Sequence, residues 1–361
     1  MDTFLTVEEY EAAARDRLPA DVWGYVYGGS GAELTLRANR AAFERLALRP
    51  RFLVDVSRCD PATTLFGARL STPIGVAPMA FHRLVHADGE VATARAAGAA
   101  GQLLVVSIFA SRSLEDIAAA AAGPLWLQLY WLRRRAVVID LVRRAEAAGY
   151  GALVLTVDTP RLGRRLRDVR AGFAVPADVT AVNLDAAVTA GTHHAADGVS
   201  ALEAHSRAEF DQTLSWADLA WLCGQTALPV LVKGLLTAED AERALAHGAA
   251  GIVVSNHGGR QLDGAVASVD ALAEVVAAAA GRCPVLLDSG VRTGADVLKA
   301  LALGASAVLV GRPVLWGLAC GGADGARDVL GLLAAELADA MVLSGRPRLA
   351  DVDATLIHNS H

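Results

Sequence analysis

Residues 252–261 read Ile252-Val253-Val254-Ser255-Asn256-His257-Gly258-Gly259-Arg260-Gln261. The residues up to Val254 are apolar, which is typical of a short strand buried on both faces. The two glycines that follow allow the backbone to adopt positive φ and to pass close to a ligand. This stretch therefore predicts a buried strand that ends in a loop carrying one imidazole and one guanidinium.

The two polar side chains of this loop indicate chemistry on an organic acid. His257 can accept a proton near neutral pH, and Arg260 is a permanent cation whose planar fork suits a carboxylate. A base beside a carboxylate clamp indicates proton abstraction from an acid substrate. A loop histidine that only caps a helix is the structural alternative, and on this loop alone the two interpretations are balanced.

The composition indicates a large core without a membrane-spanning segment. The chain has 361 residues, 53% of them hydrophobic, and α/β barrels of this length occur as one domain. No uncharged apolar run reaches the roughly 18 residues that a membrane helix needs. Residues 1–4 lack the basic and apolar regions of a secretory signal. We therefore expect a cytoplasmic protein with no membrane partner.

Charge and cysteine usage exclude two further classes of function. The net charge of −6 gives no electrostatic basis for binding nucleic acid. The four cysteines contain no close pair, so reduced thiols are expected rather than a disulfide framework or a metal site.

From Ile74 onward, short runs of Val, Leu and Ile alternate with longer helical patterns. We predict strands at Ile74–Ala77, Leu103–Ser107, Leu125–Leu129, Ala152–Val157, Val230–Lys233, Ile252–Ser255, Val285–Asp288 and Ala307–Val310. Helices are predicted between them, and a last helix covers about Ala326–Leu343. Eight such repeats most economically close into a TIM (β/α)8 barrel. A doubly wound open sheet is less favoured because no Gly-x-Gly-x-x-Gly follows the first strand.

The regions around the repeats complete the predicted organisation as a single domain over residues 1–361. Residues 1–70 are expected to form a helical N-terminal region, and residues 71–345 the barrel. After the fourth strand, almost sixty residues separate Asp158 from Trp216. A connection of this length is typical of a lid over an active site, which we place at about 172–212.

The carboxyl-terminal ends of the predicted strands and the residues just after them, where the active site of a TIM barrel lies, are mostly polar. They are Pro78 to Ala80, Ser107, Gln128, Tyr130, Thr156, Asp158, Lys233, His257, Arg260, Asp288, Gly290, Arg292, Gly311 and Arg312. The last two strands are each followed by a glycine and an arginine, the usual phosphate site of such barrels. For either arginine alone, a surface salt bridge is the alternative interpretation. For the two arginines together, that interpretation is much less favoured.

Two segments carry a resemblance to a known family. Residues 155–165 (LTVDTPRLGRR) and 254–263 (VSNHGGRQLD) closely resemble the FMN-dependent 2-hydroxy-acid oxidases and dehydrogenases, and the likeness extends from Glu9 to Gly345. Within that family, residues 128–132, 166–173 and 259–265 most resemble actinobacterial 4-hydroxymandelate oxidases of antibiotic biosynthesis. The resemblance implies an FMN cofactor and a homotetramer.

The resemblance also implies roles for the substrate-binding residues. His257 would take the substrate's proton, and Asp158 would stabilise the imidazolium that forms. Arg165, Arg260 and Tyr25 would hold the substrate carboxylate, and Tyr130 would bind the substrate hydroxyl or carboxylate.

A second set of residues is implied to bind FMN. Lys233 would lie beside N1 and O2 of the flavin ring, where it favours the anionic reduced form. The ring contacts would be Ser107, Gln128 and Thr156, with Ala77, Pro78, Met79 and Ala80 along the reactive edge. Ser255, Asp288, Gly290, Arg292, Gly311 and Arg312 complete the implied cofactor site.

The implied reaction is oxidation of an (S)-2-hydroxy acid to a 2-oxo acid, with O2 reduced to hydrogen peroxide. Phe109 stands where glycolate oxidase has a tryptophan, and we therefore expect an aromatic substrate, 4-hydroxymandelate or mandelate. A lactate or glycolate oxidase, a dehydrogenase that reduces a quinone or cytochrome, and an inactive phosphate-binding barrel are the alternatives. The other histidines, His205 among them, share no ligand spacing and are expected at the surface or in loops.

Overall fold

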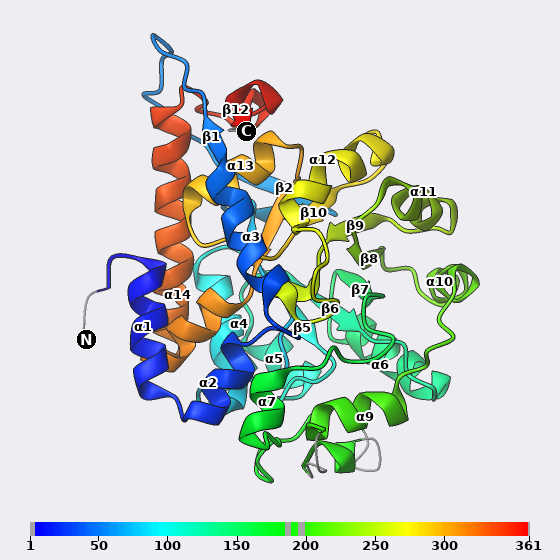
Figure 1. The fold of residues 1–361 in the computed structure, drawn as a ribbon. Coiled ribbons are helices and arrows are strands. Elements are labelled where there is room, and N and C mark those ends of the chain that lie inside the picture. Colours follow the sequence, from blue (N-terminus) through cyan, green and yellow to red (C-terminus); the bar gives the residue numbers. More distant parts are fainter. Residues whose placement is uncertain (1–3, 185–188, 194–198, 360–361) are drawn as a thin grey trace.

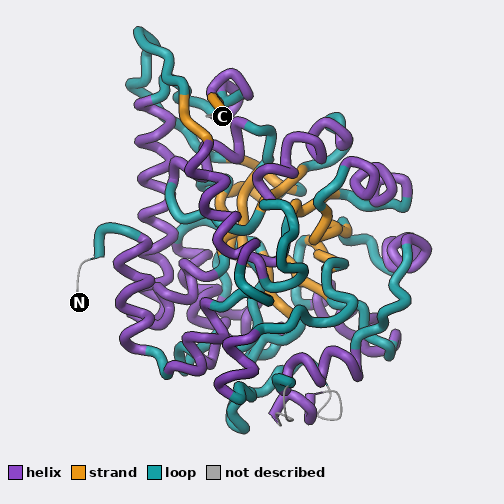
Figure 2. The backbone as a smooth tube through the Cα atoms, viewed as in Figure 1, coloured by secondary structure: helices purple, strands orange, loops and turns teal. Residues whose placement is uncertain are grey.

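A closed barrel of eight parallel strands forms the centre of the protein (Figures 1 and 2). The structure is a computed structural model that describes residues 4–184, 189–193 and 199–359. Each strand pairs with its neighbours in chain order, and β11 closes the ring on β4. The strands are β4 (Ile74–Val76), β5 (Leu103–Ser107), β6 (Leu125–Leu129), β7 (Ala152–Thr156), β8 (Val230–Leu235), β9 (Gly251–Val254), β10 (Val285–Leu287) and β11 (Ala307–Val310). The predicted TIM barrel is confirmed.

Alternate side chains along each strand belong to two different apolar cores. Val105 and Val154 belong to the cluster inside the barrel, whereas Leu104 and Leu153 pack against the surrounding helices. Successive side chains of a strand point to opposite faces, so a strand buried on both sides must be apolar throughout. A hairpin of β2 (Thr63–Leu65) and β3 (Ala68–Leu70) adds Leu65 to the interior cluster.

The helices that follow the strands form the outer layer (Figure 2). They are α4 (Glu90–Ala99), α5 (Leu114–Ala120), α6 (Arg135–Ala147), α10 (Trp216–Cys223), α11 (Ala238–Ala246), α12 (Ser268–Ala279), α13 (Gly294–Ala302) and α14 (Arg312–Leu343). The last helix begins earlier than the predicted Ala326, because the helical pattern is interrupted by non-helical backbone at Gly321 and Gly322. Its first turn consequently lies next to the barrel mouth.

The N-terminal region contains more than the predicted helices. Helices α1 (Val7–Arg17), α2 (Ala20–Tyr27) and α3 (Leu34–Arg45) lie on one side of the barrel, and α1 packs on α14 (Figure 1). Three short strands within residues 1–70 were not predicted: β2, β3, and β1 (Leu46–Leu48), which pairs with β12 (Ile357–Asn359). Three-residue strands give too short a pattern to be recognised in sequence.

The long connection after β7 is partly helical. It contains α7 (Leu166–Ala171), the short turn η2 (Ala190–His193) and α9 (Ala201–Glu209), with α7 and α9 near one another in Figure 1. Residues 185–188 and 194–198 of the predicted lid lie outside the described residues. Among the helices that are described, none combines the length and the apolar character that a bilayer crossing requires.

Candidate active site

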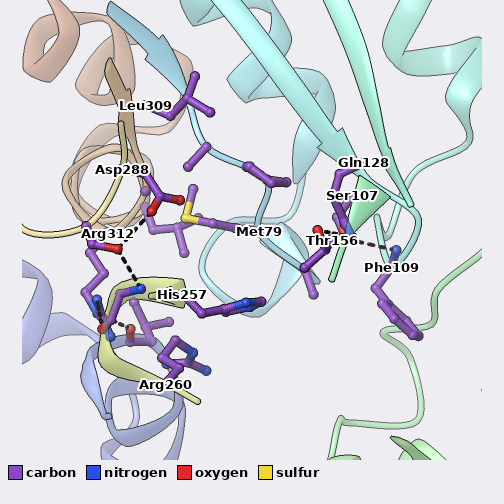
Figure 3. A pocket seen from close by; sticks show the side chains of 18 of the residues that line it. Met79, Ser107, Phe109, Gln128, Thr156, His257, Arg260, Asp288, Leu309 and Arg312 are labelled. Atoms are coloured by element: carbon purple, nitrogen blue, oxygen red, sulfur yellow. Dashed lines mark hydrogen bonds between the residues drawn. The ribbon is translucent and has the colours of Figure 1, made fainter. Parts of the chain in front are cut away.

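A cavity of about 1210 Å³, including its open mouth, lies at the carboxyl ends of the barrel strands (Figure 3). Its lining contains nearly all of the predicted site residues: Tyr25, Ala77, Pro78, Met79, Ala80, Ser107, Phe109, Gln128, Tyr130, Thr156, Arg165, Lys233, His257, Arg260, Asp288, Gly290, Arg292, Gly311 and Arg312. Asp158 and Ser255 are not in the lining. They lie directly behind His257 and Lys233 and bind them.

His257 joins a carboxylate on one side and a phenol on the other. Its Nδ1 lies 2.9 Å from Oδ1 of Asp158, and its Nε2 lies 3.4 Å from the Tyr130 hydroxyl. A carboxylate can only accept, so Nδ1 carries the proton and Nε2 keeps its lone pair. In Figure 3 the ring extends from its loop into the cavity, where Nε2 can serve as a base.

Burial and the neighbouring charges set the protonation states of this pair. Burial lowers the pKa of His257, although the Asp158 carboxylate opposes this, so the free imidazole is neutral at pH 7. Burial raises the pKa of Asp158, but contact with His257, the charge of Lys233 and the Thr159 hydroxyl outweigh it and keep that pKa below its usual value. Asp158 is therefore ionised and ready to stabilise an imidazolium.

The backbone of the histidine loop is held in an unusual shape. His257 has φ 60°, a left-handed value that is uncommon for a residue with a side chain. Helix α3 supports the loop, because Asn39 and Asn256 exchange two side-chain hydrogen bonds of 2.9 and 2.7 Å. At Gly259 a Cβ would lie 2.5 Å from the backbone nitrogen of Leu36, so only glycine fits there.

Two arginines approach the same end of the cavity. Arg165 immediately precedes α7, and its side chain is buried with no hydrogen-bond partner for Nε among the described residues. Arg260 is fixed by hydrogen bonds of 2.7 and 2.8 Å to the carbonyls of Tyr25 and Gly28, and it stacks on the Tyr25 ring. Burial and the nearby Arg165 lower the pKa of Arg260 to about 10, so Arg260 remains a cation at pH 7.

Gln261 connects the loops that carry these arginines, a role that the sequence did not reveal. Its Nε2 donates to the carbonyls of Asp158 (2.8 Å) and Arg161 (3.0 Å), and its Oε1 accepts from the Gly163 amide (3.1 Å). At Gly163 a Cβ would lie 2.6 Å from the Gln261 carbonyl oxygen, so glycine permits this close approach of the two loops.

Lys233 is a buried cation near the floor of the cavity. Its Nζ lies 2.8 Å from the Ser255 hydroxyl and 3.0 Å from Oδ2 of Asp288. Burial lowers the pKa of Lys233, but Asp288 and Asp158 more than compensate and raise it above its usual value. Ser255 also accepts the backbone N–H of His257, so one hydroxyl links the cation to the base.

Arg292 and Arg312 lie at the loops that follow β10 and β11. Arg292 stacks over Trp316 at 4.8 Å, and Arg312 donates to the carbonyls of Val26, Gly28 and Gly258. Burial lowers the pKa of Arg292 to about 10 and that of Arg312 further, where Arg260 and Arg292 add repulsion. Among the described residues neither forms an ion pair, so the positive charge is available for an anion.

The opposite wall offers small side chains and amide or hydroxyl groups. Gln128 donates to the Thr156 hydroxyl (3.0 Å), and the Ser107 hydroxyl accepts from the Phe109 backbone N–H (3.2 Å). Residues 77–80 form the edge between this wall and Arg312, with Met79 directed into the cavity in Figure 3.

An aromatic group extends the cavity beyond Tyr130, and sequence reasoning found only part of it. The ring centroid of Phe109 lies 5.7 Å from that of Tyr130 and 6.1 Å from that of Phe210. The Tyr130 ring stacks on Phe210 with a centroid distance of 4.9 Å. Helix α9 adds Leu202, His205 and Ser206 to the lining. The expectation for His205 was wrong, because it is 4% exposed and lines the cavity. The missed signal was the apolar spacing of Leu202 and Phe210 around it.

Comparisons with known proteins agree with this geometry. The FMN-dependent dehydrogenase family matches residues 14–359. The chain is 52% identical to 4-hydroxymandelate oxidase of Amycolatopsis orientalis over 95% of each chain. It is 49% identical to glycolate oxidase 5 of Oryza sativa subsp. japonica, over 98% of this chain and 95% of that one. A crystal structure of mandelate oxidase with (S)-4-hydroxymandelic acid superposes with a TM-score of 0.94 at 50% identity, covering 98% of both chains. The protein belongs to the FMN-dependent dehydrogenase family, in its branch of 2-hydroxy-acid oxidases.

Proposed function

We propose that this protein oxidises an aryl (S)-2-hydroxy acid, 4-hydroxymandelate or mandelate, to the corresponding 2-oxo acid. The observation that carries the proposal is the apolar group of Phe109, Leu202 and Phe210, which continues the cavity from the base and the arginines. A phenyl ring buries far more apolar surface there than the methyl of lactate or the hydrogen of glycolate. The likeness to 4-hydroxymandelate oxidase supports the same substrate class.

The residues present fit the FMN on which the family depends. The guanidiniums of Arg292 and Arg312, which form no ion pair within the described residues, match a phosphate, and the buried Lys233 matches the electron-rich edge of a flavin ring. Small side chains at Ala77 and Ala80 leave room for a flat ring. When bound, FMN would supply the acceptor for the two electrons of the α-carbon–hydrogen bond, and the α-hydrogen would leave the carbon with that bond's cleavage.

The chain's own residues orient the substrate and move its proton. Arg165 and Arg260 hold the carboxylate from two directions, which fixes the α-carbon in the cavity. Nε2 of His257 takes the proton of the substrate hydroxyl, and Asp158 stabilises the imidazolium through Nδ1. The Tyr130 hydroxyl, 3.4 Å from Nε2, orients the group that gives up the proton.

We further propose that O2 is the electron acceptor and is reduced to hydrogen peroxide, in a cytoplasmic homotetramer. A quinone or cytochrome acceptor would make the protein a dehydrogenase of the same acids. Peroxide formation during turnover, followed with and without an added quinone, distinguishes the two. Mass measurement in solution tests the tetramer.

The proposed substrate is tested by anaerobic flavin reduction. The purified protein should be yellow, and 4-hydroxymandelate and mandelate should bleach it with a kcat/KM well above those for lactate and glycolate. A clear preference for glycolate or lactate would overturn the aryl substrate. A colourless protein that does not take up FMN would contradict the whole assignment and would favour an inactive barrel.

A further inference from the structure

His205 is a polar side chain in an otherwise apolar part of the cavity. It lies on α9 with Leu202 on one side and Phe210 on the other, and all three are buried. Its ring stands edge-on to Phe109 at 5.7 Å and 82°, and to Phe210 at 6.5 Å and 78°. The imidazole thus borders the space that a substrate aryl ring would enter beyond Tyr130.

The imidazole lacks the partner that a buried polar group normally has. No hydrogen bond of either ring nitrogen is found within the described residues, and Nε2 is fully buried. An unpaired buried nitrogen is costly, so its retention requires an explanation. Burial also lowers the pKa of His205, which keeps the ring neutral at pH 7 with one nitrogen able to accept a hydrogen bond.

The other polar group that α9 gives to the cavity cannot play this part. The Ser206 hydroxyl donates to the Glu203 carbonyl at 2.8 Å and accepts from the Leu162 N–H at 3.1 Å. Its donor and one of its two lone pairs are used within the protein, whereas neither ring nitrogen of His205 has a partner within the described residues.

We propose that His205 is a specificity-determining residue that binds a hydrogen-bonding substituent at the far end of the substrate's aryl ring, with the phenolic hydroxyl of 4-hydroxymandelate as the group it fits. This inference rests on the proposed function and deepens it. The phenol O–H donates to Nδ1 of the neutral imidazole, the unpaired ring nitrogen that is not sealed by its surroundings as Nε2 is, and the surrounding rings exclude water from that bond. A methyl group at the same place fills a similar volume but leaves the nitrogen unpaired.

The test compares kcat/KM for 4-hydroxymandelate, 4-methylmandelate and mandelate. The native protein should favour the hydroxyl over the methyl compound by about tenfold, the effect of one hydrogen bond. His205→Leu should bring that ratio close to one while it still oxidises mandelate. His205→Asn keeps a polar side chain and should retain part of the preference. Ser206→Ala, on the same helix, should leave the ratio as in the native protein.

The outcomes separate the two proposals. A hydroxyl-to-methyl ratio that is the same in His205→Leu as in the native protein would overturn the role of His205 and leave the proposed function standing. A hydroxyl-to-methyl ratio near one in the native protein would also overturn the role of His205 and leave the proposed function standing. If the native protein binds FMN but is bleached by none of the three acids, the proposed function fails and this inference fails with it. Retained yellow colour in both His205 variants shows that they fold.

Discussion

At the scale of single residues, His257 has to satisfy two opposing demands. As the proposed base, it would have to be neutral before the reaction and hold a proton afterwards. Burial meets the first demand by lowering its pKa, and the ionised Asp158, 2.9 Å from Nδ1, meets the second. Lys233 is separated from this pair by Ser255, and its charge favours the carboxylate of Asp158.

Removing the base should slow the reaction without removing the cofactor. We expect His257→Ala to bind FMN as the native protein does, but to be reduced by substrate about 10²–10⁴-fold more slowly. Anaerobic stopped-flow bleaching of the flavin measures this rate, and the absorbance of the bound flavin is the control. Flavin reduction at a near-native rate would remove His257 from its proposed role.

The carboxylate partner should control both the rate and its pH dependence. Because the imidazole must be neutral, kcat/KM rises with pH through the pKa of His257. In Asp158→Asn the lowering by burial remains and the opposing charge is lost, so the acid limb should move to lower pH. The plateau should fall by about 10²–10⁴-fold, because the imidazolium is no longer stabilised. Thr159→Val, which keeps the carboxylate, is the matched control. An acid limb that moves upward would contradict the pairing.

Loss of an arginine that holds the substrate carboxylate should weaken substrate binding more than FMN binding. Arg165→Met removes one of two cations, and we expect substrate affinity to fall by about 100-fold, the usual cost of breaking a buried charged contact. An uncharged amide analogue of the substrate should be affected far less. Equal losses for the acid and the amide would mean that Arg165 does not hold the carboxylate.

At the scale of elements, helix α3 acts as the support of the histidine loop. The Asp263 carboxylate accepts the backbone N–H groups of Ala32 and Thr35, at 2.8 and 3.0 Å, at the start of the helix. Together with the paired amides of Asn39 and Asn256, this fixes the loop from outside the barrel.

Two glycines of this loop region offer a matched comparison. Both have positive φ, 74° at Gly259 and 90° at Gly264, but a Cβ would collide with α3 only at Gly259, whereas a Cβ at Gly264 would meet no atom within 4 Å. Gly264→Ala should cost about 1–2 kcal/mol of the free energy of unfolding from backbone strain alone. Gly259→Ala should cost clearly more and should weaken FMN binding, because α3 must move. Thermal unfolding and flavin titration measure both, and equal effects of the two substitutions would contradict the close packing.

The sequence predicted the barrel well and the walls of the cavity only in part. Strands such as Leu103–Ser107 and Leu125–Leu129 were predicted to the residue, because both faces are buried and flanking polar residues mark their ends. Helix α3 was predicted only as part of a helical region over residues 1–70, and its support of the loop was missed, since its contacts with residues 256–265 join segments more than two hundred positions apart. His205 was misplaced although Leu202 and Phe210 gave a local apolar spacing around it, because its contact with Phe109 is distant in sequence.

At the scale of the whole molecule, four guanidiniums gather around one cavity. Arg165, Arg260, Arg292 and Arg312 line it, and within the described residues none of the four forms an ion pair. Their mutual repulsion opposes folding, and in the proposed function the phosphate of FMN and the substrate carboxylate would both relieve it.

Without FMN, the stability of the protein should therefore depend on which anion is present in solution. We expect the flavin-free protein to unfold at a lower temperature and to recover on adding FMN, by about 2.7 kcal/mol at 100 times the dissociation constant. Sulfate or inorganic phosphate should stabilise it more than chloride at equal ionic strength. In Arg292→Leu this difference between anions should shrink. The same stabilisation by chloride and by phosphate would argue against an anion site.

The bond between Asn39 and Asn256 also bears on how the chain is made. A ribosome releases the first of these amides long before the second exists, so the early helices must wait for most of the barrel before they can dock. The histidine loop acquires its shape only when the segment around Asn39 contacts the segment around Asn256, which is synthesised much later. Catalytic competence thus becomes one of the last properties that the newly synthesised molecule acquires.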